Sequence, residues 1–134
     1  MTVGRSSSPT HQAGAAAEDA AMQFLQQQGF QLLAQNYHTP YGELDIVVLQ
    51  QQLLVFAEVR LRKADALVSA QQSVTPRKQQ KIIQSAQYFL QQFPAYQDCD
   101  CRFDVMALQP QAAPALNAYP GYQVDWIQAA FYAE

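Results

Sequence analysis

Two apolar runs decide the fold: Gly42-Glu43-Leu44-Asp45-Ile46-Val47-Val48 and, after the polar break Gln50-Gln51-Gln52, Leu54-Val55-Phe56-Ala57-Glu58-Val59-Arg60-Leu61-Arg62. Each run is typical of a strand, and the break between them allows only a hairpin-like return. Because side chains alternate faces along a strand, Asp45 should share a face with Glu43, and Glu58 should share one with Arg60 and Arg62. The sequence therefore predicts two antiparallel strands, at about 43–49 and 53–61, whose polar faces lie side by side.

These polar faces carry the residue types of a metal site. Two carboxylates on rigid strands, with guanidinium groups beside them, can hold a divalent metal ion against a phosphate group. We therefore predict that Asp45 and Glu58 are metal ligands. Cross-strand ion pairing on a solvated surface, for example between Arg60 and Asp45, is the alternative that the sequence leaves open.

The rest of the chain fits a single folded domain. It has 134 residues, of which 49% are hydrophobic and 14% charged, which is enough to bury a core. No apolar run reaches the roughly 18 residues of a membrane-spanning helix. The polar, Ser-rich start has no apolar core of a signal peptide. We expect a flexible arm over residues 1–10, one domain over residues 11–134, and a cytoplasmic protein.

Positive charge is concentrated in one part of the sequence. The net charge is −3, yet six of the eight Lys and Arg residues fall between positions 60 and 81, where Asp65 is the one acid. A basic field beside the carboxylate pair is what a phosphate-binding site needs, although a solvated surface would look the same. Nucleic-acid contact is predicted for Arg62, Lys63, Arg77, Lys78 and Lys81.

The two cysteines, Cys99 and Cys101, are separated by one residue, and a disulfide between them is not expected. With His11 and His38 they could supply four zinc ligands, but this spacing matches no known zinc pattern. We predict reduced, structural thiols.

The remaining elements follow from periodicity and from Pro and Gly. A helix is expected over 12–28, with Gly29 past its end, and a second over 75–92, with Thr75 as N-cap and Pro76 in its first turn. Strands are expected at 30–37, 102–108 and 122–127. Three segments should be less regular: a turn at 38–42, a crossover at 63–74 and a loop at 109–121. A short helical end is expected at 128–132.

This order of elements predicts an α/β fold around a mixed sheet. Three consecutive strands favour an antiparallel meander, and the helix between the third and fourth strands lets those two pair in parallel. On the fourth strand Asp104 lies among apolar residues. A buried acid needs a partner, which Arg102 could supply.

Taken together, these motifs resemble the YraN-type group (UPF0102), and through it the PD-(D/E)xK nuclease superfamily. The similarity runs from about residue 13 to residue 131, nearly the whole chain, and its motifs stand at the following positions. They are Gly14, Glu18, Gly29, Gly42-Glu43-Leu44-Asp45, Phe56-Ala57-Glu58-Val59-Arg60-Leu61-Arg62, Val74-Thr75-Pro76-Arg77-Lys78-Gln79 and Cys101-Arg102-Phe103-Asp104-Val105.

The resemblance implies a restriction-endonuclease-like αβββαβ core, with a five-stranded mixed sheet flanked by helices. It implies an endonuclease that hydrolyses phosphodiester bonds in structured or damaged DNA. The metal, Mg²⁺ or Mn²⁺, would be held by Asp45 and Glu58, with Glu18 and the Val59 carbonyl as further ligands. Arg60 takes the place of the superfamily's usual lysine. Arginine stays protonated and cannot act as a base, but it can grip a phosphate with two hydrogen bonds.

Two other functions remain open at this point. The domain could hold nucleic acid without cutting it. It could also be an interaction protein whose exposed strand edge and aromatic C-terminal segment recruit a partner or a second copy to form a homodimer.

Overall fold

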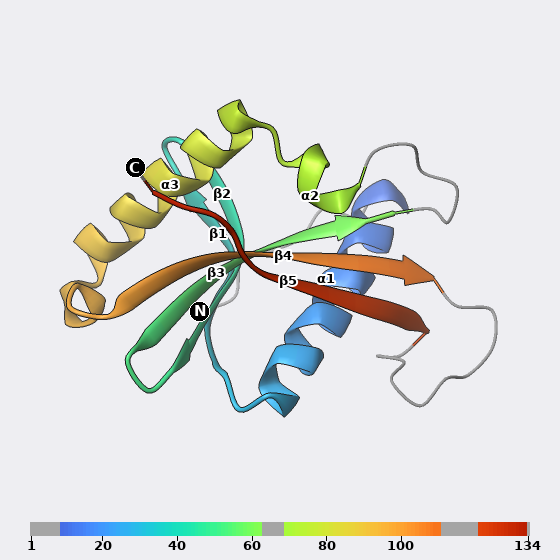
Figure 1. Cartoon of the computed structure of the whole chain (residues 1–134), viewed down its shortest axis with the longest axis horizontal. Coiled ribbons are helices and arrows are strands. Elements are labelled where there is room, and N and C mark those ends of the chain that lie inside the picture. Colours follow the sequence, from blue (N-terminus) through green and yellow to red (C-terminus); the bar gives the residue numbers. More distant parts are fainter. Residues whose placement is uncertain (1–8, 63–68, 111–120, 134) are drawn as a thin grey trace.

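A five-stranded sheet in the order β1-β2-β3-β4-β5 organises the chain (Figure 1). The computed structural model describes residues 9–62, 69–110 and 121–133. The elements are, in order, α1 (Pro9–Gln27), β1 (Gln31–Thr39), β2 (Gly42–Gln50), β3 (Leu53–Leu61), α2 (Ala70–Ser73), α3 (Pro76–Gln92), the 3₁₀ turn η1 (Pro94–Tyr96), β4 (Asp100–Pro110) and β5 (Tyr122–Phe131).

The sheet is mixed, as its sequence predicts. β1, β2 and β3 form an antiparallel meander. β3 and β4 pair in parallel, with Leu53 beside Asp100 and Leu61 beside Leu108, and β5 returns antiparallel to β4. The parallel pair is possible because α2 and α3 carry the chain back to the start of the sheet. The predicted α/β class and order of strands are thus confirmed.

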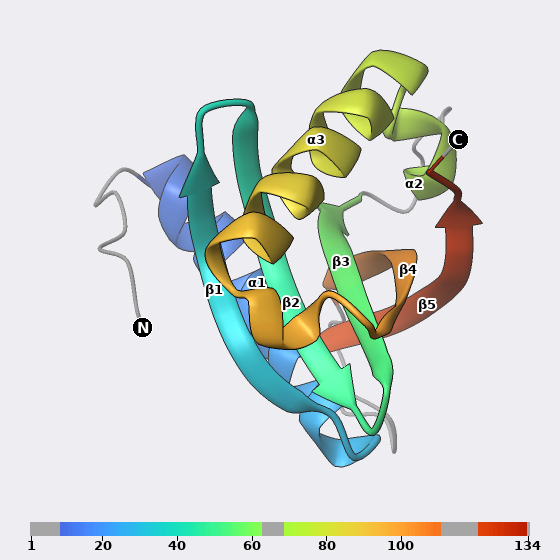
Figure 2. The same ribbon diagram turned by 90° about the vertical axis from the view of Figure 1, so that its left-hand side faces the viewer.

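The two long helices cover opposite faces of the sheet (Figure 2). On one face, small residues of α1 such as Ala17 and Ala21 let this helix pack closely against Ile46, Val48 and Val55 of the sheet. Under α3 lies an aromatic core that includes Phe56, Phe89, Phe103 and Phe131. The central strands are consequently apolar on both faces, and β3 is buried almost from end to end. None of the described helices is long and apolar enough to cross a membrane.

The start of α3 follows the predicted capping pattern. The Thr75 hydroxyl accepts a hydrogen bond from the Lys78 backbone N–H at 3.3 Å, and Pro76 occupies the first turn, where no N–H partner is needed. In the middle of the helix the Ser85 hydroxyl lies 2.8 Å from that of Thr39, at the end of β1. This contact ties α3 to the β1–β2 turn.

Two terminal boundaries differ from the expectation. α1 begins at Pro9, three residues before the predicted start; the rest of the expected arm lies outside the described residues. The predicted helical end at 128–132 is wrong, because β5 continues as a strand to Phe131. It does so through a register shift opposite Phe103 and Val105, where Ala129 has φ 50°. The Asp104 carboxylate accepts the Ala129 N–H at 3.0 Å, which stabilises this irregular backbone.

The crossover also contains a helix that was not predicted. Residues 63–68 lie outside the described residues, but Ala70–Ser73 form α2. Its N-cap Ser69 accepts from the Gln72 N–H at 3.1 Å, while the Gln72 side chain accepts from the Ser69 N–H at 3.2 Å. This reciprocal capping box stabilises a helix too short to show a period. The expected loop over 109–121 is likewise shortened, since β4 runs to Pro110 and residues 111–120 are not described.

Candidate metal and phosphate site

The site forms where β2 and β3 separate. Their pairing runs from Gln50 opposite Leu53 to Ile46 opposite Ala57 and stops there. Beyond this point β2 pairs only with β1, and the Glu58–Leu61 part of β3 pairs only with β4. The next residues along, Asp45 and Glu58, therefore face each other across the opening between two strands.

The backbone changes face at the same place. Leu44 and Val47 both pack in the core under α3, while Ile46 packs under α1. On β1, Asn36 lies between the partners of Leu44 and Ile46 and has a left-handed φ of 53°. The strict alternation predicted through Glu43, Asp45 and the following residues is therefore wrong at this point. The kink turns Asp45 into the gap between the strands.

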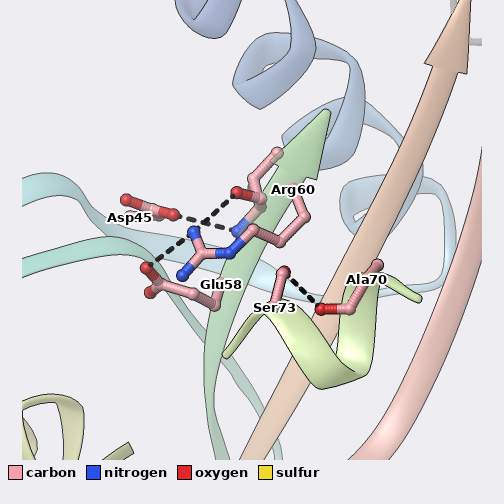
Figure 3. A network of polar contacts seen from close by, with 6 residues as sticks. Asp45, Glu58, Arg60, Ala70 and Ser73 are labelled. Atoms are coloured by element: carbon pink, nitrogen blue, oxygen red, sulfur yellow. Dashed lines mark hydrogen bonds and ion pairs between the residues drawn. The ribbon is translucent and has the colours of Figure 1, made fainter. Parts of the chain in front are cut away.

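Asp45 takes the role of a missing backbone acceptor. Its Oδ2 accepts the Val59 N–H at 2.9 Å, so the side chain continues the hydrogen bonding that the departing β2 backbone no longer supplies (Figure 3). The Asp45 carboxyl also lies close enough to Glu58 for its charge to raise the pKa of that acid. Two carboxyl groups from neighbouring strands thus lie near each other at this opening.

This meeting disturbs the ionisation of both acids. Burial raises the pKa of Asp45, partly offset by its hydrogen bond from Val59. Burial and then the Asp45 charge raise the pKa of Glu58 well above its usual value. The two negative charges therefore disfavour each other, and the pKa of Glu58 is raised the more strongly of the two.

Arg60 is the cation of the site. Its Nη1 donates to Glu58 Oε1 at 3.4 Å and to the Val59 carbonyl oxygen at 3.3 Å (Figure 3). The side chain of Arg60 is 23% exposed and that of Glu58 12%. The ion pair anticipated between Arg60 and Asp45 is thus made with Glu58 instead, although the Arg60 charge lowers the pKa of both acids.

The third predicted carboxylate contributes less directly. Glu18, on α1, is close enough for its charge to raise the pKa of Glu58. Within the described residues, however, no three His, Cys, Asp or Glu side chains are grouped so that they could hold a metal between them. The site consists of two carboxylates and the Val59 carbonyl, and the role of Glu18 as a ligand stays a prediction.

The predicted nucleic-acid residues lie in two places. Arg62 continues the pairing of β3 with β4 through its N–H to the Leu108 carbonyl, and its Nε is buried with no hydrogen-bond partner among the described residues. Arg77, Lys78 and Lys81 are exposed on the first turns of α3, and none forms an ion pair with a carboxylate in the described ranges. Lys63 lies outside those ranges.

Sequence reasoning missed that α2 borders the site. Figure 3 shows Ala70 and Ser73 of α2 beside Glu58 and Arg60. The Ser73 hydroxyl donates to the Ala70 carbonyl at 2.6 Å, within α2 itself. The available signal was the Ser69–Gln72 spacing of a capping box, which predicts a helix start even where no apolar period follows.

A second buried acid serves the structure. Asp104 is fully buried and accepts hydrogen bonds from Arg102 Nε and Nη2, both at 2.9 Å, from Trp126 Nε1 at 2.8 Å and from the Ala129 N–H. Its predicted partnership with Arg102 is confirmed. Cys99 and Cys101 are free thiols; Cys101 lies at the surface, where partial burial and then the neighbouring Cys99 and Asp100 raise its pKa.

Comparison with known proteins identifies the family. Residues 17–108 match the model described as "Uncharacterised protein family UPF0102". A UPF0102 protein of Psychrobacter sp. (strain PRwf-1) is 41% identical over 131 residues, covering 94% of this chain and 92% of the relative. One of Pseudomonas syringae pv. syringae (strain B728a) is 44% identical over 124 residues, covering 92% and 96%. One of Saccharophagus degradans is 43% identical over 121 residues, covering 90% and 93%. The chain therefore belongs to the uncharacterised protein family UPF0102.

Proposed function

We propose that this protein is a Mg²⁺-dependent endonuclease of the PD-(D/E)xK type, which hydrolyses phosphodiester bonds in structured or damaged DNA. One observation carries the proposal: the carboxyl groups of buried Glu58 and half-buried Asp45 lie close together at the opening between β2 and β3. Two carboxylates whose like charges repel each other, placed beside a guanidinium group, are typical of functional sites rather than of packing.

The residues of the site fit a hard divalent cation. Mg²⁺ prefers oxygen ligands and is commonly held by one or two carboxylates with water and substrate oxygens completing its shell. Asp45, Glu58 and the Val59 carbonyl would hold it here, and Mn²⁺ would suit the same oxygens. When bound, the ion would supply charge stabilisation at the phosphate and a more acidic water.

The protein's own groups have distinct roles in this proposal. A carboxyl group must be ionised to bind a cation, and the pKa of Glu58 is raised, so metal binding and cleavage are expected to increase as the pH rises. Arg60 is suited to hold a phosphate oxygen pair and to offset developing negative charge. It cannot accept a proton, so we assign it charge stabilisation and not general-base catalysis.

Cleavage of a panel of linear, nicked and branched DNAs in Mg²⁺ or Mn²⁺ tests this function. Asp45→Asn and Glu58→Gln are the informative changes. The amide introduced by Asp45→Asn keeps an oxygen that can accept the Val59 N–H, so the fold should survive. Changing a residue that hydrogen-bonds to a metal ligand typically costs roughly 10- to 100-fold in activity. Because Asp45 and Glu58 are the proposed ligands themselves, each change should lower the cleavage rate by more than that.

The matched control is Asp98→Asn, which removes an exposed acid from the turn just before β4. The control should cut like the wild type. An inert wild-type protein on every DNA, or full activity in both site variants, would contradict the proposal.

A second candidate function is non-catalytic binding of nucleic acid. It is supported by the exposed cations of α3, which form no ion pair within the described residues, and by arginine at position 60 in place of a lysine. In this case nucleic-acid binding would not require the carboxyl groups of Asp45 and Glu58, but it would require the basic residues of α3. The homodimer anticipated from exposed strand edges stays a prediction.

A further inference from the structure

Two partly buried arginine–carboxylate contacts in the described part of the chain are built differently. Arg102 meets Asp104 through two nitrogens and two oxygens, both at 2.9 Å, which is the strong, parallel geometry of a fixed pair. Arg60 meets Glu58 through a single nitrogen at 3.4 Å, longer than the roughly 2.7–2.9 Å usual for such charged bonds. Arg102 is locked in place, whereas Arg60 makes contacts that are easily released.

The weak contacts of Arg60 share one atom. Nη1 bonds both to Glu58 Oε1 and, at 3.3 Å, to the Val59 carbonyl oxygen. These two oxygens belong to the set that the proposed function assigns to the divalent cation. One positively charged nitrogen therefore occupies acceptors that a metal ion would need.

We infer that the Arg60 guanidinium is a built-in competitor of the divalent cation, and that a bound phosphate group releases it. The inference rests on the proposed metal site and adds to it a means of regulation. A guanidinium group and a metal ion on the same oxygens repel each other and draw on the same lone pairs, so each lowers the affinity of the other. Arg60 remains tethered to β3, within reach of a phosphate beside the site, and a phosphate can offer it two charged hydrogen bonds instead of one long one.

A consequence is that metal and phosphate bind cooperatively. A phosphate that engages Arg60 frees Glu58 and the Val59 carbonyl, and so strengthens metal binding. By thermodynamic linkage the metal then strengthens phosphate binding by the same factor. Metal alone would bind weakly, and the site would be completed only when a phosphate is present.

Calorimetric titration with Mn²⁺ tests the inference without any measurement of cleavage. Wild type, Arg60→Gln and Arg62→Gln are titrated in sodium chloride and in sodium sulfate of equal ionic strength, with sulfate as the tetrahedral anion. Arg62→Gln is the matched control, since it removes the same charge two residues along β3 and forms no described hydrogen bond to either oxygen.

In chloride we expect Arg60→Gln to bind Mn²⁺ at least about fivefold more tightly than wild type, the low end of usual coupling between sites. Arg62→Gln should change affinity much less. Sulfate should tighten Mn²⁺ binding to wild type and have no such effect on Arg60→Gln.

Three outcomes would overturn the inference: equal Mn²⁺ affinity in wild type and Arg60→Gln, an equal gain in Arg62→Gln, or a sulfate effect that persists undiminished without Arg60. Asp45→Asn separates this failure from failure of the metal site. If one of these three outcomes is observed while Asp45→Asn still abolishes Mn²⁺ binding, the metal site stands and only the role of Arg60 falls. If no variant binds Mn²⁺ at all, both fall.

Discussion

Glu58 is a carboxyl group held where its charge is disfavoured. Burial and the neighbouring Asp45 both raise its pKa, and the long contact with Arg60 only partly compensates. Asp104 is more deeply buried, yet each of its oxygens accepts two well-formed hydrogen bonds. Burial alone therefore does not distinguish a functional acid. The distinguishing property is an acid whose surroundings leave its charge poorly satisfied.

The substitution Glu58→Gln should stabilise the protein at neutral pH. Because the pKa of Glu58 is raised in the folded state, that state binds more protons than the unfolded chain above pH 4.5. Folding stability must therefore decline as the pH rises from about that value through the raised pKa. Glu58→Gln removes this decline together with the buried charge. Urea unfolding between pH 4 and 8 measures it.

In that experiment wild type should lose stability with rising pH more than Glu58→Gln does, so the two curves diverge toward neutral pH. Glu43→Gln serves as the control, because Glu43 is well exposed and pairs with His38 at 3.2 Å across the β1–β2 turn. Parallel curves for wild type and Glu58→Gln would show that the acid carries no such penalty.

Among the elements, β5 depends most on a single distant side chain. Its irregular backbone at Ala129 is held by Asp104 on β4, which also fixes the Trp126 indole. Trp126 in turn packs edge-on against Phe24 and Phe30, so this acid connects β5 with the start of the sheet and with α1. Asp104 thus determines where the last strand ends.

Asp104→Asn should lower the free energy of unfolding by about 3 kcal/mol, the lower end of the range for breaking a buried pair, because Arg102 stays partly exposed. Trp126 is the single tryptophan, so its fluorescence during urea unfolding reports directly on this contact. Asp125→Asn, at an exposed position on β5, should change stability by less than about 0.5 kcal/mol. Equal stability of both variants would contradict the role of Asp104. If Asp104→Asn fails to fold, circular dichroism will show the larger loss directly.

The elements that sequence predicted well are those specified by neighbouring residues. The alternation and the Gln-rich break specify the β2–β3 hairpin, and Thr75-Pro76 with the apolar stripe of Ile82, Ile83 and Phe89 specifies α3. The end of β5 could not be predicted, because the chain there is held as a strand by Asp104, 25 residues away. α2 was missed because four residues show no period, although its capping box was readable.

The candidate site was predictable in composition and less so in geometry. The approach of Asp45 to Glu58 follows from the hairpin register, and the structure brings the two together. The change of face at Asp45 depends on Asn36 on another strand, which no local pattern indicates. The pairing of Arg60 with Glu58 joins residues two apart on β3, which share a face, and could have been weighed from the sequence.

Across the whole molecule, positive charge is segregated although the net charge is −3. Arg60 and Arg62 lie at the end of β3, and three further cations lie on the exposed first turns of α3, which follows directly after α2. Such local segregation creates an attractive field for an anionic polymer that the net charge conceals. A protein coated all over with basic residues would bind nucleic acid less selectively.

Binding of duplex DNA should depend on salt through α3. Each phosphate contact contributes roughly 0.9 to the slope of log K against log salt concentration, so Lys78→Gln with Lys81→Gln should reduce its magnitude by about two. The control is Lys78→Arg with Lys81→Arg, which keeps both charges and should keep the slope. Fluorescence anisotropy between about 50 and 200 mM salt measures both. An unchanged slope in the Gln variant would exclude α3 as a DNA contact.

The single parallel pairing of the sheet has a consequence for the order of assembly. Asp45 and Glu58 are brought together by a local hairpin, which needs only a short loop to close, whereas β4 can join β3 only after the chain has completed its excursion through α2 and α3. Such long-range closure is the slow part of folding. We therefore expect the acid pair to be still hydrated when the hairpin first forms. The cost of desolvating the two acids should then fall on the last stage of folding, when most native contacts already exist.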